Sequence, residues 1–272
     1  MRRTETATKP TRAGLSETAR SPTGRRILLF GDSHAYAVQR AIAKRQGKGQ
    51  PVSISAHRLL KEKNGVQIGN TSFEAFLKLI GDLGPDDVVV SMIGGNQHAV
   101  YGTIQHPQPF DFFTPERPTL SEGPAEVIPY RALEDVFATG LRRGDGRSLE
   151  ALRAATVAGV VHILPPPPKQ DNAHIEKHHE SMFANDLPHH GVSSPELRLK
   201  FWKLQTRILI QICTELEMEV VKPPEPAVDE AGFLRPEFYA NDATHGNWRY
   251  GERVLRELER LYLGSSAERV PK

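Results

Sequence analysis

The sequence predicts a three-layer α/β/α sandwich built on a mainly five-stranded parallel sheet. Short apolar runs alternate with longer segments of helical periodicity, which is typical of parallel strands joined by crossover helices. The runs are almost wholly apolar, as expected for strands that helices cover on both faces. Because no internal repeat is seen, we expect one domain over residues 25–265, with insertions at about 97–129 and 170–194.

The first two strands are expected near the N-terminus. Residues 26–30 are short and apolar, and a Gly-Asp-Ser turn follows them. Residues 34–46 are expected to form a helix, which Gly47 ends. Residues 52–56 form the second expected strand, and residues 58–70 are expected to be a basic loop that contains glycines.

The third strand, at residues 87–93, runs directly into Gly94-Gly95-Asn96. A helix capped by Thr71 or Ser72 is expected before it, since Phe73, Phe76, Leu77 and Ile80 share one face. Residues 97–129 follow the strand and contain six prolines and three phenylalanines without a clean period. A loop of this length is usually functional or disordered. Its aromatic residues favour a packed cover over the site.

The C-terminal half continues the alternation. Helices are expected at residues 130–141 and 148–157, and a strand at 159–164, which Pro165 ends. After the polar, histidine-rich segment 170–194, Ser194 and Pro195 begin a long helix. The fifth strand is expected at residues 218–222. A last helix is expected at about 248–263, with four residues buried: Val254, Leu255, Leu258 and Leu261.

Composition excludes several classes of function. The 272 residues carry 35 basic and 33 acidic side chains, so the net charge of +2 argues against a nucleic-acid partner. The single cysteine, Cys213, cannot form an internal disulfide and is expected to be a buried, inert thiol. Residues 1–24 lack the apolar stretch of a secretory signal, and no run is long enough to span a membrane. We therefore expect a flexible N-terminal tail and a cytoplasmic protein; the sequence does not define the oligomeric state.

Two ends of the chain together predict acyl transfer through a serine. Ser33 follows an apolar strand and precedes a helix, so its hydroxyl is expected at the carboxyl edge of the sheet. A serine nucleophile needs a histidine base that a carboxylate orients, and Asp242 and His245 can share one turn. The alternative is that Ser33 only caps the next helix. The Asp-His pair could likewise cap the last helix, although Asn247 suffices for that.

These segments resemble the four blocks of the SGNH (GDSL-like) hydrolase superfamily. Ser33 in Gly-Asp-Ser, Gly69 in Gly-Asn-Thr, Asn96 in Gly-Gly-Asn, and Asp242 with His245 match the blocks in order. The resemblance covers residues 26–263 and implies a flavodoxin-like fold and a serine hydrolase that needs no cofactor. The chain departs from the family at His34 and Gln97, where the family has Leu after the serine and often Asp after the asparagine. The Gly-Asp-Ser-His variant resembles domains that act on acyl groups of bacterial polysaccharides.

The resemblance implies an oxyanion hole formed by Ser33, Gly69 and Asn96. A side-chain amide and backbone N–H groups stabilise the charge that an acyl tetrahedral intermediate places on oxygen. Gly65 is the alternative glycine, and an ordinary turn is the alternative interpretation of both. Further candidates are expected to shape the substrate pocket: Asp32, His34, Gly95, Gln97, His98 and Trp248.

Five histidines in residues 174–190 raise the alternative of a metal site. His174 and His178 would share one face of a helix, but no acidic general base lies between them. We therefore expect no metal, and interpret the segment as a solvated or pocket-facing loop.

The sequence thus predicts a serine esterase for a short acyl group, such as an O-acetyl group on a sugar or polysaccharide. The partner would be a small-molecule or carbohydrate ester. An acyltransferase using the same residues, a non-catalytic carbohydrate-binding domain and a metal-assisted hydrolase remain the alternatives.

Overall fold

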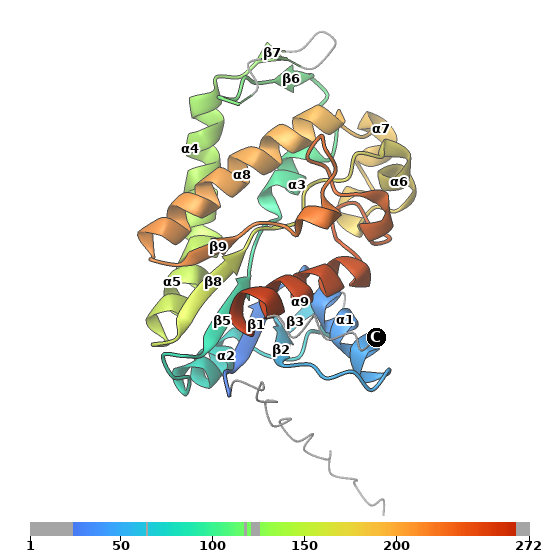
Figure 1. Ribbon diagram of the computed structural model, residues 1–272. Coiled ribbons are helices and arrows are strands. Elements are labelled where there is room, and N and C mark those ends of the chain that lie inside the picture. Colours follow the sequence, from blue (N-terminus) through green and yellow to red (C-terminus); the bar gives the residue numbers. More distant parts are fainter. Residues whose placement is uncertain (1–23, 64, 117–118, 121–125, 265–272) are drawn as a thin grey trace, which may run out of the picture.

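Figure 1 shows the computed structural model, which describes residues 24–63, 65–116, 119–120 and 126–264. A five-stranded parallel sheet lies at its centre, in the order β2-β1-β5-β8-β9. The strands are β1 (Ile27–Gly31), β2 (Ile54–Arg58), β5 (Val88–Met92), β8 (Gly159–Ile163) and β9 (Glu219–Val221). The predicted fold class is confirmed. Residues 1–23 of the expected N-terminal tail lie outside the described residues, and so does residue 265, the expected end of the domain.

Strand register brings two of the sequence blocks to the same edge of the sheet. Gly31, the last residue of β1, lies between Arg58 of β2 and Met92 of β5. A Cβ at Gly31 would lie 2.7 Å from the Met92 carbonyl oxygen, so only glycine allows this close approach. The chain leaves β1 toward β2 and returns on the other side to β5. Parallel sheets bind ligands at the crevice formed by such a reversal.

Helices cover both faces of the sheet (Figure 1). One layer consists of α1 (Ala35–Gln46) and α9 (Trp248–Tyr262); the other consists of α2 (Phe73–Gly81), α4 (Tyr130–Leu141), α5 (Arg147–Ala154) and α8 (Pro195–Glu215). Alternate residues of β1 enter the two cores: Leu28 and Phe30 pack in one, Ile27 and Leu29 in the other. This two-sided burial explains the uninterrupted apolar runs in the sequence.

Side-chain caps begin three of these helices. Ser72, Ser194 and Asn247 each accept a backbone N–H from the first turn of α2, α8 and α9, respectively. The two serine caps agree with the expected helix starts, and the Asn247 cap leaves Asp242 and His245 free for another role. Pro195 follows its cap at the first helical position, where its missing N–H costs nothing.

The segment over residues 58–70 differs from its prediction. It is not a loop but an antiparallel pair, β3 (Lys61–Lys63) and β4 (Val66–Ile68). This pair has little apolar surface, so its sequence lacks the alternation that marks a half-buried hairpin.

The segment over residues 97–129 also differs from its prediction. It forms α3 (Gln97–Gly102), β6 (Phe110–Asp111) and β7 (Glu126–Val127). Phe110 and Phe112 pack against Phe201 of α8, with ring centroids 6.0 and 5.0 Å apart. Lys200 of α8 binds both carboxylate oxygens of Asp111 at 2.8 Å. Phe110 and Phe112 therefore pack on α8, whereas Phe113 is 43% exposed.

The remaining short helices connect these layers. They are η1 (Arg142–Gly146), a π-type turn, and α6 (Asn172–Lys177), η2 (Ser181–Phe183), α7 (Leu187–His190), η3 (Glu225–Ala227) and η4 (Pro236–Phe238). Cys213 is fully buried, and burial raises the pKa of its thiol to about 12, as expected for an inert cysteine. None of the described helices combines the length and the apolar character that crossing a bilayer requires.

Candidate active site

Ser33 lies where β1 gives way to α1, at the carboxyl edge of the sheet. The Ser33 residue is half-buried, and its carbonyl accepts the Tyr36 backbone N–H, which begins the helical turn. The neighbouring Asp32 accepts a hydrogen bond from Lys61 Nζ at 2.5 Å. Lys61 is therefore neutralised by Asp32 and does not present a free positive charge.

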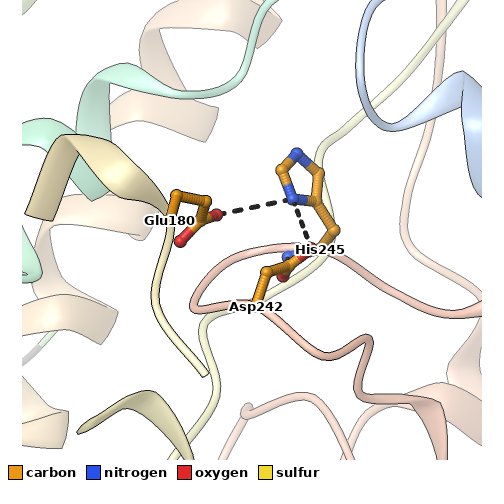
Figure 2. Close-up of side chains that lie close together, drawn as sticks. All are labelled: Glu180, Asp242 and His245. Atoms are coloured by element: carbon orange, nitrogen blue, oxygen red, sulfur yellow. Dashed lines mark hydrogen bonds and ion pairs between the residues drawn. The ribbon is translucent and has the colours of Figure 1, made fainter. Parts of the chain in front are cut away.

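His245 and Asp242 form a hydrogen-bonded pair on one turn, as their spacing predicts (Figure 2). Asp242 Oδ2 lies 3.0 Å from His245 Nδ1. Its Oδ1 accepts the backbone N–H groups of Thr244 and His245 at 3.1 and 2.7 Å, which fixes the carboxylate. Burial alone would raise the pKa of Asp242. The hydrogen bond and charge of His245, with the charge of Lys169, outweigh it and hold the pKa far below its ordinary value.

Glu180 is a second carboxylate beside His245 that the sequence did not reveal. Figure 2 shows both carboxylates directed at Nδ1 of His245, and Glu180 Oε1 lies 3.6 Å from that nitrogen. Glu180 Oε1 accepts the Thr244 hydroxyl at 2.7 Å, and Oε2 accepts the Ala243 N–H at 3.0 Å. Glu180 thus holds the turn that carries His245 and adds negative charge next to its ring.

Lys169 binds the same turn and is a second residue that the sequence did not reveal. Its side chain is completely buried and donates to the Ala240 carbonyl at 2.7 Å and to the Asp242 carbonyl. Its Nζ is 3.4 Å from Asp242 Oδ1. Burial lowers the pKa of Lys169, while Asp242 and Glu180 oppose that shift. The signal in the sequence was a lysine directly after four prolines at the end of a strand.

Three histidines meet at the candidate site. The His34 ring lies 4.9 Å from the His245 ring, centroid to centroid, so the residue after Ser33 packs against His245. Burial, together with the charges of His245 and His98, holds the pKa of His34 well below its ordinary value. Burial likewise lowers the pKa of His98 to about 4, and its backbone N–H is bound to Gln205. Both imidazoles are therefore neutral at pH 7.

His245 Nε2 is buried and has no hydrogen-bond partner among the described residues, and the same is true of both ring nitrogens of His34. Within the described structure, the Ser33 hydroxyl therefore does not donate a hydrogen bond to His245 Nε2. Catalytic hydrogen bonds are often long in the absence of substrate and tighten in the complex.

The Gly94-Gly95-Asn96 turn projects Asn96 into the same region. Both glycines have positive φ, 76° and 96°, and a Cβ at Gly95 would lie 2.7 Å from Pro165 Cβ. Asn96 precedes α3 but makes no side-chain cap, so its amide is not used by that helix. A Cβ at Gly95 would also lie 3.5 Å from His34 Nε2, so the turn that carries Asn96 lies beside that imidazole.

The structure distinguishes the two candidate glycines. Gly69 has φ 87°, and a Cβ there would overlap the carbonyl of Leu59, whose N–H binds the Gly31 carbonyl at 2.9 Å. Gly65 also has a positive φ, 74°, but there is open space around its Cβ position. The requirement for glycine beside the end of β1 therefore applies to Gly69.

A pocket of about 440 Å³ opens beside these residues. It has an apolar wall of Phe30, Leu59, Phe73 and Ile93 and a polar wall of Asp32, Asn96, Gln97, Asp145 and Ser148. Asp32 and Gln97 line this pocket, and Trp248 lines a different one. The lining of the 440 Å³ pocket does not include Ser33, His34, Gly95, His98 or His245.

Asp145, on the π-type turn η1, is a pocket residue that the sequence did not suggest. A Cβ at Gly94 would overlap its carboxylate, and the backbone N–H of Gly95 approaches it. Burial, with the charge of Asp32, raises the pKa of Asp145. Isolated π-type turns occur frequently at functional sites.

The histidine-rich segment does not form a metal site of its own in the described structure. His174 and His178 have ring centroids 4.8 Å apart, but no third ligand joins them. Among the described residues, Glu180, Asp242 and His245 are the one group whose ligand atoms converge within 4.8 Å. His174 Nε2 instead lies 3.0 Å from the Ala240 carbonyl and so packs the segment against the turn that carries His245.

No protein-family model matches the chain, and no curated protein matches it. Similar solved structures include a GDSL-like lipase from Bacteroides thetaiotaomicron, with 14% identity over 90% of this chain and 91% of that chain, and a TM-score of 0.45. A putative acylhydrolase from Bacteroides fragilis has 13% identity over 91% of both chains and a TM-score of 0.45. Est24, a carbohydrate acetylesterase from Sinorhizobium meliloti, has 13% identity over 88% of this chain and 100% of that chain, and a TM-score of 0.41. The chain resembles GDSL-like hydrolases.

Proposed function

We propose that this protein is a serine esterase that hydrolyses a short acyl ester, preferentially an O-acetyl group on a sugar or polysaccharide. The observation that carries the proposal is the His245–Asp242 pair, with Nδ1 bound to the carboxylate and Nε2 left without a partner among the described residues. His34, which follows Ser33 in the chain, packs against the same imidazole. A histidine oriented in this way is the base that a serine nucleophile requires.

In the proposed reaction Ser33 Oγ attacks the acyl carbonyl carbon and its proton passes to His245 Nε2. Asp242 holds Nδ1–H and stabilises the imidazolium that forms. His245 then returns the proton to the leaving alcohol, and an acyl-serine remains. Water attacks the acyl-serine, with His245 again the base, and releases the carboxylic acid and free Ser33.

The proposed oxyanion hole consists of the backbone N–H groups of Ser33 and Gly69 and the side-chain amide of Asn96. Two structural features support it: the amide of Asn96 does not cap α3, and Gly69 is held against Leu59 next to β1. Losing one such donor typically slows catalysis about 10²–10³-fold.

The pocket supports a small, neutral, hydroxyl-bearing substrate. Its volume of about 440 Å³ is at the small end of ligand pockets, which run from roughly 300 to 1,000 Å³. Asp32 and Asp145 both lie in its wall, and one lysine, Lys61, binds Asp32. Carboxylate oxygens accept hydrogen bonds from sugar hydroxyls, and an amide both accepts and donates them. Lys61 compensates the charge of Asp32 only, so the carboxyl group of Asp145 disfavours an anionic ester at this position.

Hydrolysis of p-nitrophenyl acetate, butyrate and octanoate by wild type and Ser33→Ala tests the proposal. We expect turnover to fall with acyl length and to be lost in Ser33→Ala. A second arm adds an acetylated sugar with and without a free acceptor sugar. Acyl transfer to the acceptor faster than release of acetate would favour the acyltransferase. Equal background rates for both proteins on every ester would favour a non-catalytic carbohydrate-binding domain.

A further inference from the structure

A second pocket, separate from the candidate active site, lies between α1 and α9. These helices run side by side on one face of the sheet (Figure 1). The pocket has a volume of about 510 Å³, a size that accommodates a small ligand. Its rim comes from the end of α1, the start of α9 and η4, and it includes Trp248 and Phe238.

The charge of this pocket is strongly positive although the chain as a whole is nearly neutral. Six basic and two acidic side chains line it. One of the two acids, Glu252, is already bound by Arg45 and Arg256 at 2.8 Å. The other four basic side chains form no ion pair within the described residues: Lys44, Lys48, Arg249 and Arg253.

Trp248 adds an aromatic surface to this cationic pocket. Lys44 Nζ lies 4.5 Å from the centroid of its ring, and Arg249 Cζ lies 5.5 Å from it. The half-buried indole therefore presents an apolar surface next to two cations. A ligand that combines apolar C–H groups with negative charge matches both features. A sugar ring that carries a carboxylate or a phosphate has this composition.

We propose that the α1–α9 pocket is a binding site for an anionic saccharide. The ring of the saccharide packs against Trp248, and its carboxylate or phosphate binds the unpaired basic groups around Lys48 and Arg253. Charge-assisted hydrogen bonds from arginine to such anions are among the strongest in proteins. The 440 Å³ pocket beside the candidate active site has Asp32 and Asp145 in its wall, so the two pockets differ in the sign of the charged side chains that line them. Binding at the α1–α9 pocket does not require esterase activity.

Calorimetric titration of the full chain tests this site, with trigalacturonate and fructose 1,6-bisphosphate as the anionic saccharides and maltotriose as the neutral control. We expect at least one anionic saccharide to bind and maltotriose not to bind. We also expect affinity to fall at least threefold from 50 to 250 mM NaCl, because screening weakens surface charge interactions. Binding of trigalacturonate alone identifies the source of the anion as a uronate; binding of the bisphosphate alone identifies it as a sugar phosphate.

Charge reversal locates the site. The double variant Lys48→Glu/Arg253→Glu should weaken binding at least tenfold. Arg40 is an exposed residue of α1 that lies outside the pocket. The variant Arg40→Glu should leave the binding affinity within about twofold of wild type, after correction for its smaller change in net charge. Thermal unfolding of each variant checks that the fold is kept, and Lys48→Gln replaces the double variant if that one is unfolded.

Three results would overturn the proposal. They are no binding of either anionic saccharide, equal binding of maltotriose, and an equal loss of affinity in Arg40→Glu. Tighter binding of a single-stranded oligonucleotide, abolished by the same double variant, would also overturn it and assign the pocket to nucleic acid. Ester hydrolysis by Ser33→Ala is measured separately, so failure of the esterase proposal and failure of this one are distinguishable.

Discussion

Replacement of Lys169 by methionine should destabilise the protein strongly, because this buried ammonium holds the turn that carries His245. Its Nζ lies 3.4 Å from Asp242 Oδ1 and also binds the carbonyls of Ala240 and Asp242. At an effective dielectric constant of about 20, a charge pair at this distance is worth about 5 kcal/mol. The methionine variant no longer pays for desolvating a charged lysine, which offsets part of the lost attraction. We therefore expect the unfolding free energy to fall by about 3–5 kcal/mol.

Urea unfolding of wild type and Lys169→Met measures this loss, with Lys78→Met as the control. Lys78 is an exposed lysine of α2 whose replacement should change the unfolding free energy by no more than about 0.5 kcal/mol. A loss below about 1 kcal/mol for Lys169→Met, with an unchanged urea dependence, would refute the reasoning.

The same variant should change how stability depends on pH. Asp242 binds its proton more weakly in the folded than in the unfolded protein, because its folded pKa is lowered. Its contribution is therefore complete above the ordinary carboxyl pKa and is lost as pH falls below about 4. Without Lys169 the folded pKa of Asp242 rises toward its ordinary value, so acidification from pH 5 to 3 should remove less stability than in wild type.

Four further substitutions probe the site. Asp242→Asn should lower kcat up to about 10⁴-fold, because the amide favours the wrong tautomer of His245. Glu180→Gln acts only through the turn that carries His245 and should lower kcat about tenfold. Steady-state kinetics that showed a larger loss for Glu180→Gln would refute this ranking. Gly94→Ala should destabilise the protein, since a Cβ would overlap Asp145 and φ is 76°; an unchanged Tm would contradict this steric reasoning. Asp145→Asn should raise Tm more at pH 8 than at pH 4, because a carboxyl with a raised folded pKa loses stability as pH rises through that pKa. An increase in Tm independent of pH would show that the carboxyl charge is not the cause.

The fold and the local pieces of the candidate site could be predicted because their signals are short in sequence. An apolar run followed by Gly-Asp-Ser defines both a strand end and a turn, and Asp242 and His245 need only one turn to meet. The last helix shows the limit of such patterns. Its buried stripe continues from Leu258 to Tyr262, four residues on, and leaves Leu261 37% exposed.

Glu180 and Lys169 could not be predicted in the same way. Each reaches the His245 turn only because the segment after β8 folds back on it, through contacts such as His174 with Ala240. No local periodicity encodes that packing. Trp248 illustrates the converse: it lies three residues from His245 in sequence, yet the direction of α9 turns it into the α1–α9 pocket.

The most direct test of the proposed chemistry is the reaction of the protein with a fluorophosphonate, followed by intact mass and peptide mapping. An active serine attacks phosphorus and displaces fluoride, so the account predicts one adduct, on Ser33, that Ser33→Ala abolishes. Loss of p-nitrophenyl acetate hydrolysis should follow the adduct in proportion. An adduct on another residue, or esterase activity that survives in Ser33→Ala, would contradict the assignment of Ser33 as the nucleophile.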